Sequence, residues 1–307
     1  MSASNRLPFA HFLLALAVVA IWGSNFVVIR LGLDALPPLL FATLRFSLAV
    51  LPAVFFIQRP DLPWRNLASY GLLIGVGQFG LLFLAMRGPQ PAISPGLASL
   101  VIQTQVFFTL MLSMRLTREP VKGYQWLALG LAASGIALIA SHTDGSATPL
   151  GLAMVLAAAF SWACANMVGK QAGRVNMLAY MVWTSVFAVP PLLLLSLLVE
   201  GPQAMAAGLH KADLGTWAAV LWQALGNTLF GYAAWGWLLA RHAPATVVPL
   251  ALLVPVFGMS TAALVLGEGL PAWKLIAAGL VLAGLALNLL WPLRQWKNAQ
   301  TQTELTK

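Results

Sequence analysis

Charged residues are scarce in this chain: they make up 8% of its 307 residues, and only eight of them are acidic. Soluble globular domains carry roughly 25% charged residues, so the composition argues against a soluble fold. All eight acids fall in predicted loops, at helix ends or in the C-terminal tail. Because proton relays across membranes usually depend on an intramembrane carboxylate or histidine, this placement argues against a dedicated carboxylate relay.

The chain has a single cysteine, Cys164, which excludes an intrachain disulfide. Its four histidines, at positions 11, 142, 210 and 242, are far apart in sequence and match no metal-ligand spacing. An intramembrane enzyme would need His, Asp, Glu or metal ligands clustered within its helices, and the sequence has no such cluster. We therefore expect no catalytic residue, no metal and no cofactor.

Long apolar segments dominate what is present, since 60% of the residues are hydrophobic. Each is close to the ~20 residues that a helix needs to cross ~30 Å of hydrocarbon. The first is too long for the apolar core of a secretory signal, so we expect a spanning helix there too. Ten such stretches are predicted: 10–29, 38–57, 67–86, 95–114, 124–141, 150–169, 178–199, 216–240, 245–266 and 272–291.

The net charge of +9 follows the predicted topology rather than a nucleic-acid surface. Cytoplasmic loops of membrane proteins carry an excess of Lys and Arg. With both termini in the cytoplasm, 12 of the 17 basic residues fall in inner segments, four fall outside and one lies within the membrane. We therefore expect a multi-pass protein of a bacterial-type plasma membrane, in contact with lipid and not with nucleic acid.

An internal repeat appears when the chain is shifted by 149 residues, which aligns the fourth and fifth apolar segments with the ninth and tenth. The matches that depend least on composition are Pro95 with Pro244, Glu119 with Glu268, Gly130 with Gly279 and Gly135 with Gly284. The same shift places Gln78 on Asn227. We therefore divide the chain into a first repeat at 1–145, a second at 146–292 and a cytoplasmic tail at 293–307.

Five helices in each repeat is an odd number, so the second repeat must have the opposite orientation in the membrane. Inverted repeats of this kind are typical of secondary transporters, whose substrate sites lie near the midplane between the two halves. The predicted fold class is an all-α membrane protein with ten transmembrane helices in two inverted five-helix repeats.

Several segments together resemble the drug/metabolite transporter superfamily: WGSNFVVIRLGL, PPLLFATLRF, PGLASLVIQTQVFFT, AFSWACAN and PLALLVPVFGMSTAALVLGE. Within it the chain is most similar to EamA-type exporters of amino-acid metabolites such as cysteine and O-acetylserine. The resemblance covers about residue 10 to 291 and implies a central cavity that opens to one side of the membrane at a time. It is specific for the family and weak for the substrate.

Arg45 is the principal candidate for substrate binding, because it lies inside an apolar helix about 10 Å below Pro38. A cation at such depth costs about 2.5–3.5 kcal/mol on insertion scales, so it normally faces a bundle interior or a wet cavity. Its planar fork of donors suits a carboxylate. The alternatives are that it reaches the outer interface or caps a broken neighbouring helix.

Polar and aromatic side chains on other helices complete the predicted substrate-binding set: Trp22, Asn25, Gln78, Gln103, Gln105, Trp162, Asn166, Asn227 and Trp235. Buried amides must face protein or a cavity, so hydrogen bonding between helices is the alternative for Asn25 and Asn166, and packing is the alternative for Trp162. Gln103 and Gln105 point in nearly opposite directions, and the sequence does not decide which of them faces the pathway.

Three further features concern helix structure. On the eighth helix a stripe runs through Gln223, Asn227, Gly231 and Trp235, and Tyr232 lies off it and is a weaker candidate. Gly71 and Gly75 form a GxxxG motif that permits close backbone approach. Pro249 and Pro255 are candidate hinges for a gate, with static kinks as the alternative, and Glu119 and Glu268 are expected to cap helices or to pair with Arg118 or Lys274.

Together these observations predict a secondary transporter that exports amino-acid-like zwitterions by alternating access, as a monomer or weak homodimer. The alternative is a broader exporter of drugs, aromatic amino acids or other amphiphiles, which the 12 Trp and 15 Phe residues favour.

Overall fold

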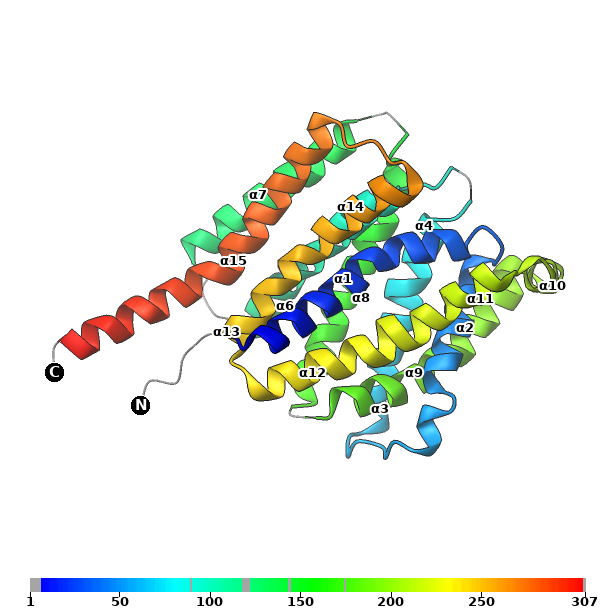
Figure 1. Ribbon diagram of the computed structural model, residues 1–307, viewed down its shortest axis with the longest axis horizontal. Helices are drawn as coiled ribbons and strands as arrows, with labels where there is room; N and C mark the ends of the chain where they lie inside the picture. The colour runs from blue at the N-terminus through cyan, green and yellow to red at the C-terminus, as the bar shows by residue number, and fades with distance from the viewer. Residues whose placement is uncertain (1–6, 89, 118–121, 143–144, 174, 306–307) are drawn as a thin grey trace.

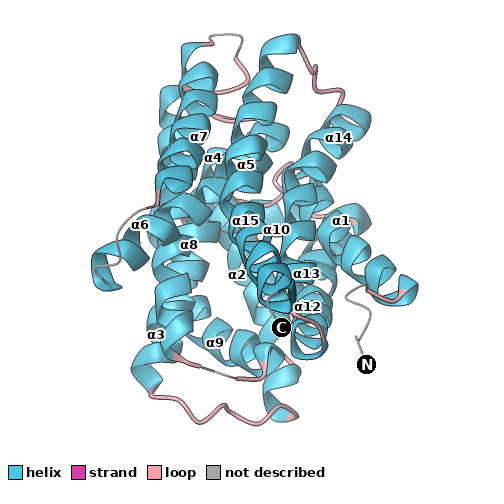
Figure 2. Ribbon diagram, turned by 90° about the vertical axis from the view of Figure 1, so that its left-hand side faces the viewer, coloured by secondary structure: helices cyan, strands magenta, loops and turns pink. Residues whose placement is uncertain are grey.

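The computed structural model describes residues 7–88, 90–117, 122–142, 145–173 and 175–305, and these residues form a bundle of helices without a named strand (Figures 1 and 2). The elements in chain order are α1 (Phe9–Gly32), α2 (Pro38–Val50), η1 (Ala53–Phe55), α3 (Trp64–Leu72), η2 (Leu73–Gly80), α4 (Leu81–Ala85), α5 (Pro95–Val101), η3 (Ile102–Thr104), α6 (Gln105–Thr117), α7 (Gly123–Ser141), α8 (Pro149–Gln171), α9 (Met177–Leu195), η4 (Ser196–Glu200), α10 (Pro202–Lys211), α11 (Leu214–Leu221), η5 (Trp222–Phe230), α12 (Gly231–Arg241), α13 (Pro244–Val247), η6 (Val248–Leu253), α14 (Val254–Leu266) and α15 (Ala272–Leu305).

Nine helical stretches of the described chain are long and apolar enough to cross a membrane, and they correspond to nine of the ten predicted segments. The predicted eighth segment, 216–240, is helical through α11, η5 and α12, but it is less apolar than the others and does not qualify. Gln223 and Asn227 explain the difference, because two amides in one segment lower its hydropathy. The all-helical membrane fold is therefore confirmed, and the exact number of ten spans is not.

Local sequence explains where many helices begin and end. Pro38, Pro95, Pro149 and Pro202 lie in the first turns of their helices, where the missing backbone N–H costs nothing. Asp213 caps α11 by accepting hydrogen bonds from the Thr216 backbone and hydroxyl, which lower the pKa of its carboxyl. The segment predicted as a tail continues α15 as far as Leu305.

The two repeats share unusual backbone geometry at the predicted shift of 149 residues. A π-helical stretch occupies 73–80 in the first repeat (η2) and 222–230 in the second (η5), which is the same position after that shift. The 3₁₀ segment η3 at 102–104 corresponds to 251–253, which lies inside the 3₁₀ segment η6. Such breaks in regular hydrogen bonding are uncommon, so their recurrence supports a structural repeat more strongly than matching Leu and Ala residues do.

The repeats run in opposite directions. Helices α7 and α15 are repeat partners, and the rings of Tyr124 and Trp291 lie 6.0 Å apart at one end of the pair while those of His142 and Trp273 lie 4.3 Å apart at the other. The partners α2 and α9 are also antiparallel, since the Leu39 backbone meets Glu200. Hereafter the near end is the end of the bundle where α1 and α9 begin, and the far end is where α2 begins.

Glycines permit the closest contacts between the repeats. A Cβ at Gly135 of α7 would lie 2.9 Å from the Ala277 carbonyl oxygen, and one at Gly284 of α15 would lie 2.6 Å from that of Ala128. These two contacts are equivalent under the 149-residue shift. The predicted close approach at Gly71 and Gly75 is also confirmed, because added Cβ atoms would lie 2.1 Å from the Thr184 oxygen and 2.4 Å from the Ala188 Cβ of α9.

Replacement of Gly135 by leucine is expected to destabilise the fold by about 1–3 kcal/mol, because the side chain has no space between α7 and α15. Gly130 is the matched control on the same helix, since an added Cβ there meets nothing within 4 Å. Thermal unfolding in detergent should give a lower Tm for Gly135→Leu and an unchanged Tm for Gly130→Leu. Equal Tm values for the two variants would contradict the proposed packing.

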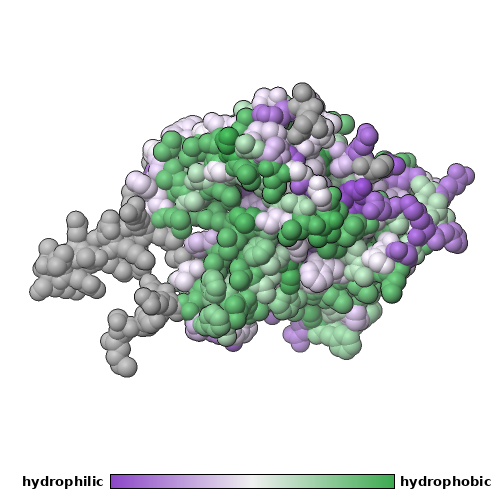
Figure 3. Space-filling view, turned by 45° about the horizontal axis from the view of Figure 1, so that its top comes forward, coloured by the Kyte–Doolittle hydropathy of each residue, from purple (hydrophilic) through white to green (hydrophobic). Residues whose placement is uncertain are grey.

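Hydrophobic side chains also cover much of the outer surface, as expected for contact with lipid (Figure 3). Large exposed apolar residues occur on many helices, among them Leu198, Leu264 and Leu275. The interior instead holds buried polar groups, including Arg45, Gln223 and Asn25. These polar residues lie within a mainly hydrophobic core, where they can form a site between the repeats.

Candidate functional site

Arg45 is buried between the two repeats, with only 1% of its surface exposed. Its Nη2 donates a hydrogen bond of 2.8 Å to Thr228 Oγ1 in η5, and its guanidinium lies 3.8 Å from the centre of the Phe79 ring. Its Nε and Nη1 have no hydrogen-bond partner, and the single salt bridge within the described residues joins Arg30 and Asp34. The guanidinium therefore carries a buried charge that no described carboxylate neutralises, and it does not reach the outer interface.

A hydrogen-bond chain extends from Arg45 into η5 and α1. Thr228 Oγ1 donates to the Gln223 carbonyl oxygen at 2.9 Å, and Gln223 Nε2 donates to Asn25 Oδ1 at 2.7 Å. The amide oxygen of Gln223 is buried without a partner. The two η5 residues are five apart, the spacing of a π-helix, and such segments frequently occur at functional sites.

Aromatic rings lie beside this chain. Trp22 Nε1 donates to the Asn227 carbonyl oxygen at 3.2 Å, and the Trp22 ring lies 5.2 Å from that of Trp235 and 5.7 Å from that of Tyr232. An added Cβ on Gly231 would meet Trp22 Nε1 at 2.5 Å. The stripe on the eighth helix therefore faces α1 rather than a cavity.

A second polar cluster lies between α6 and α8. Asn166 Nδ2 donates to Gln105 Oε1 at 2.8 Å and to Thr109 Oγ1 at 3.2 Å. Gln103 is 9% exposed, and Trp162 packs half-buried against the hydrophobic core. For Asn25 and Asn166 the structure therefore gives hydrogen bonds between helices, the alternative that the sequence left open.

Gln78 lies in η2, next to the Phe79 ring that stacks on Arg45. It is 5% exposed, and its amide oxygen is buried without a partner. The predicted correspondence of Gln78 and Asn227 holds in burial, because Asn227 is 6% exposed. Neither of them lines the pocket described next.

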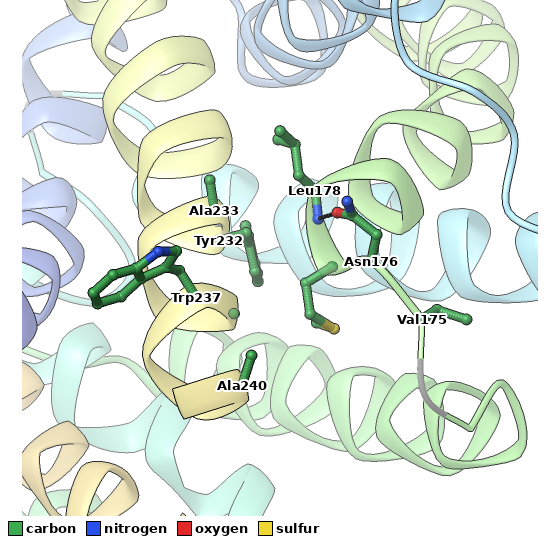
Figure 4. Close-up of a pocket in the computed structure, with 9 residues that line it drawn as sticks. Val175, Asn176, Leu178, Tyr232, Ala233, Trp237 and Ala240 are labelled. Carbon is green, nitrogen blue, oxygen red and sulfur yellow. Dashed lines mark hydrogen bonds between the residues drawn. The ribbon is translucent and has the colours of Figure 1, made fainter. Parts of the chain in front are cut away.

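A pocket of about 360 Å³ lies at the near end, between the start of α9 and α12 (Figure 4). Its lining residues are Val175, Asn176, Met177, Leu178, Tyr232, Ala233, Gly236, Trp237 and Ala240. None of the ten predicted substrate-binding residues is among them, and none of the ten lies on α9. Tyr232, the weaker candidate of the sequence analysis, belongs both to this pocket and to the ring cluster with Trp22.

One sequence signal could have revealed the pocket. Ala233, Gly236 and Ala240 are small residues spaced three and four apart, so they lie on one face of α12. Such a face leaves space beside the helix when the neighbouring helix does not fill it. The neighbouring helix is α9, and its first residue, Met177, faces Gly236. An added Cβ on Gly236 would lie 3.0 Å from the Met177 Cβ.

The predicted hinge prolines occupy a real irregularity in the ninth segment. Pro249 lies inside η6, and Pro255 lies in the first turn of α14. The equivalent 3₁₀ segment η3 has no proline, so the irregularity does not require one. Movement at these prolines stays a prediction. Glu268 caps a helix as expected, because its Oε1 accepts from the Gly96 backbone N–H at 3.2 Å, whereas Glu119 lies outside the described residues.

Comparison with known proteins agrees with this architecture. The chain matches the EamA-like transporter family twice, at residues 10–141 and 149–290. A protein of Salmonella typhimurium named a probable amino-acid metabolite efflux pump is 43% identical, over 90% of this chain and 93% of that protein. A protein of Escherichia coli with the same name is 41% identical, over 90% and 93%.

More distant relatives share the fold. The uncharacterized inner membrane transporter YedA of Escherichia coli is 28% identical, over 94% of this chain and 92% of that protein. A crystal structure that is 18% identical covers 93% of this chain and 98% of its own, with a TM-score of 0.62. The two matched segments and the antiparallel repeat partners lead to one conclusion: this multi-pass membrane protein belongs to the EamA-like transporter family.

Proposed function

We propose that this protein exports amino acids or related metabolites, such as cysteine or O-acetylserine, by alternating access, and that it is not an enzyme. The names of the two relatives above 40% identity support this substrate class. Their match to most of the chain supports a small-molecule substrate. The observation that carries the proposal is the pair of unpaired donors on the buried Arg45 guanidinium.

The unpaired buried polar atoms complement a zwitterion. Arg45 offers two buried donors without acceptors, Nε and Nη1, which suit a carboxylate. Gln78 and Gln223 each offer a buried amide oxygen without a donor, which suits an ammonium group. Buried polar atoms without partners are costly, so a ligand that supplies both kinds of partner would stabilise them.

The pocket at the near end is the proposed entrance to this site. Tyr232 connects them, because it lines the pocket and contacts the Trp22 ring, whose helix α1 also carries Asn25. In the described conformation Arg45 is buried, so a substrate in the pocket must displace side chains before it reaches the guanidinium.

We further propose that the protein lies in a bacterial inner membrane with both termini in the cytoplasm. The excess of basic residues in the loops on the side of the termini supports this orientation. The near end would then face the cytoplasm, as an exporter in its loading state requires. The division at residues 145 and 292, and a monomer or weak homodimer, belong to the same proposal.

A broader exporter of amphiphiles is the second candidate, and the pocket lining favours it. Tyr232, Trp237 and Met177 give the pocket a mainly apolar wall that would accept an aromatic or flexible compound. In that case the unpaired donors of Arg45 would contribute little to selectivity.

Competition in proteoliposomes distinguishes the two candidates. We expect unlabelled cysteine and O-acetylserine to inhibit flux of a labelled amino acid, whereas the matched decarboxylated amine and the N-acetylated acid should bind at least about tenfold more weakly, because each loses one charged contact. Flux should persist when the pH gradient is collapsed. Equal inhibition by uncharged amphiphiles would favour the broader exporter.

A further inference from the structure

A carboxylate of the second repeat caps a helix of the first repeat at the far end. Glu200, at the end of η4, accepts hydrogen bonds from the backbone N–H groups of Leu39 at 2.6 Å and Leu40 at 3.0 Å. Ser196 Oγ donates to the same carboxylate at 2.6 Å. The first N–H groups of a helix lack partners within the helix and attract negative charge, so Glu200 ties the start of α2, the Arg45 helix, to α9.

The repeat symmetry identifies an equivalent contact at the near end. For the helix pair α2 and α9 the repeat shift is 139 residues, in place of the 149 residues that align the later helices. It places the start of α2 at Pro38 on the start of α9 at Met177. It also places Leu39 and Leu40 on Leu178 and Ala179. In the described conformation those two N–H groups are accepted by Asn176 Oδ1, at 3.0 and 3.2 Å.

The counterpart of Glu200 under this shift is Asp61, again a carboxylate. It lies in the segment between η1 and α3 at the near end, and its side chain is exposed to solvent. The two carboxylates therefore correspond in the sequence shift but differ in environment: Glu200 bonds to the start of α2, whereas the N–H groups of Leu178 and Ala179 are held by Asn176.

The two ends of the bundle also differ in the exposure of equivalent residues. Val175 and Leu178 line the pocket at the near end. Their counterparts at the far end, Leu36 and Leu39, are only 2% and 3% exposed. The described conformation is thus open at the near end, where the carboxylate is disengaged, and closed at the far end, where it is engaged.

Helix α10 reinforces the closed end, and in Figure 1 it lies opposite both chain termini. An added Cβ on Gly208 would lie 2.5 Å from the Pro37 ring, and Lys211 Nζ donates to the Asp34 carbonyl oxygen at 2.6 Å. The segment before α2 is therefore held by α10, and the first turn of α2 is held by Glu200.

From these observations we propose that Glu200 and Asp61 are a pair of alternating latches that position α2 and α9 during transport. Glu200 closes the far end in the described conformation. When the repeats exchange their conformations, Glu200 releases α2 and Asp61 takes the Leu178 and Ala179 N–H groups from Asn176, which closes the near end. The proposal rests on the proposed alternating-access transport, and it assigns to each state the carboxylate that holds it.

Cysteine labelling without substrate tests the latches. With Cys164 replaced by alanine, Leu36→Cys reports opening of the far end and Val175→Cys reports opening of the near end, and the two positions are equivalent under the 139-residue shift. A membrane-impermeant maleimide is added to each side of proteoliposomes in turn. Asp213→Asn is the matched control, because Asp213 caps its own helix and does not join the repeats.

Glu200→Gln is expected to raise labelling of Leu36→Cys by about tenfold and to lower that of Val175→Cys, because two charge-assisted hydrogen bonds of the closed far end are lost. Asp61→Asn should change both labelling rates in the opposite direction, and the double variant should lie between the two. Asp213→Asn should change neither. Glu200→Asp should change both labelling rates in the same direction as Glu200→Gln, but by less. It replaces Glu200→Gln in the test if that variant does not fold.

Unchanged labelling in folded Glu200 variants, or shifts of the same sign for Glu200→Gln and Asp61→Asn, would overturn the latch proposal. The labelling needs no substrate, so its outcome is independent of the competition assay. If the two variants change the labelling rates in opposite directions but the protein transports no amino acid, the latch proposal is supported and the proposed substrate is rejected.

Discussion

Replacement of Arg45 by alanine is expected to lower amino-acid flux by about a hundredfold, equivalent to ~3 kcal/mol, while the protein still inserts and folds. The reason is that the guanidinium is a buried cation without a described counter-charge, and its Nε and Nη1 are left for the substrate carboxylate. Flux of a labelled amino acid into proteoliposomes, with the amount of folded protein determined by gel filtration, measures the effect. Arg45→Lys should recover flux only in part, because an ammonium lacks the planar fork.

Two controls separate substrate binding from structural support. Thr228→Val removes the hydrogen-bond partner of Arg45 and keeps its charge, so it should reduce flux far less than Arg45→Ala does. Arg87→Ala removes an exposed arginine and should change nothing. If Thr228→Val lowers flux as much as Arg45→Ala, transport requires the hydrogen bond between Arg45 of α2 and Thr228 of η5. The proposed binding of the substrate carboxylate by Arg45 is then rejected.

Gly236→Phe is expected to abolish transport almost completely, because the ring would occupy the pocket beside Met177. An added Cβ at this position already lies 3.0 Å from the Met177 Cβ, so the larger side chain must extend into the pocket of about 360 Å³. Flux under saturating substrate is the measurement, since a blocked entrance cannot be overcome by concentration.

The matched control for this variant is Gly279→Phe on α15. Gly279 is exposed, and an added Cβ there meets nothing within 4 Å, so the same substitution adds a ring to an open surface. Normal flux in Gly279→Phe together with lost flux in Gly236→Phe supports the pocket as the route. Normal flux in both variants would mean that substrate reaches Arg45 by another path.

The sequence predicts the outline of this fold because the membrane imposes simple rules on it. A spanning helix needs about 20 apolar residues, so hydropathy alone places nine stretches correctly. An odd number of helices in each repeat predicts opposite orientations, and the antiparallel pair α7 and α15 agrees. Gly71 and Gly75 are predicted as contact points because a missing side chain has the same consequence in any bundle.

The site is harder to predict, because a buried polar residue has several ways to find a partner. Asn25 and Asn166 look equally suited to substrate, and in the described conformation both bond to glutamines on neighbouring helices. Gln223, which carries an unpaired oxygen beside the Arg45 network, gave no stronger signal than the other amides. Pairing depends on which helices meet, and one sequence does not contain that information.

The pocket was missed for a related reason. A cavity is defined by side chains that fail to fill a space, and here the space lies between α9 and α12, which are distant in sequence. Periodicity places Tyr232 off the polar stripe, although that stripe faces α1 and Tyr232 reaches the pocket. The π-helical turn in η5 also changes the angular spacing of residues that follow it, so helical-wheel reasoning loses accuracy beyond Phe230.

The glycine contacts between α7 and α15 have a consequence for how the repeats can move. Gly135 against Ala277 and Gly284 against Ala128 are the same contact seen from each repeat, and both are present together. An exchange of conformations converts each contact into the other and leaves this interface as it was. Under the proposed alternating access, the crossing of α7 and α15 would therefore stay fixed while the remaining helices rearrange about it.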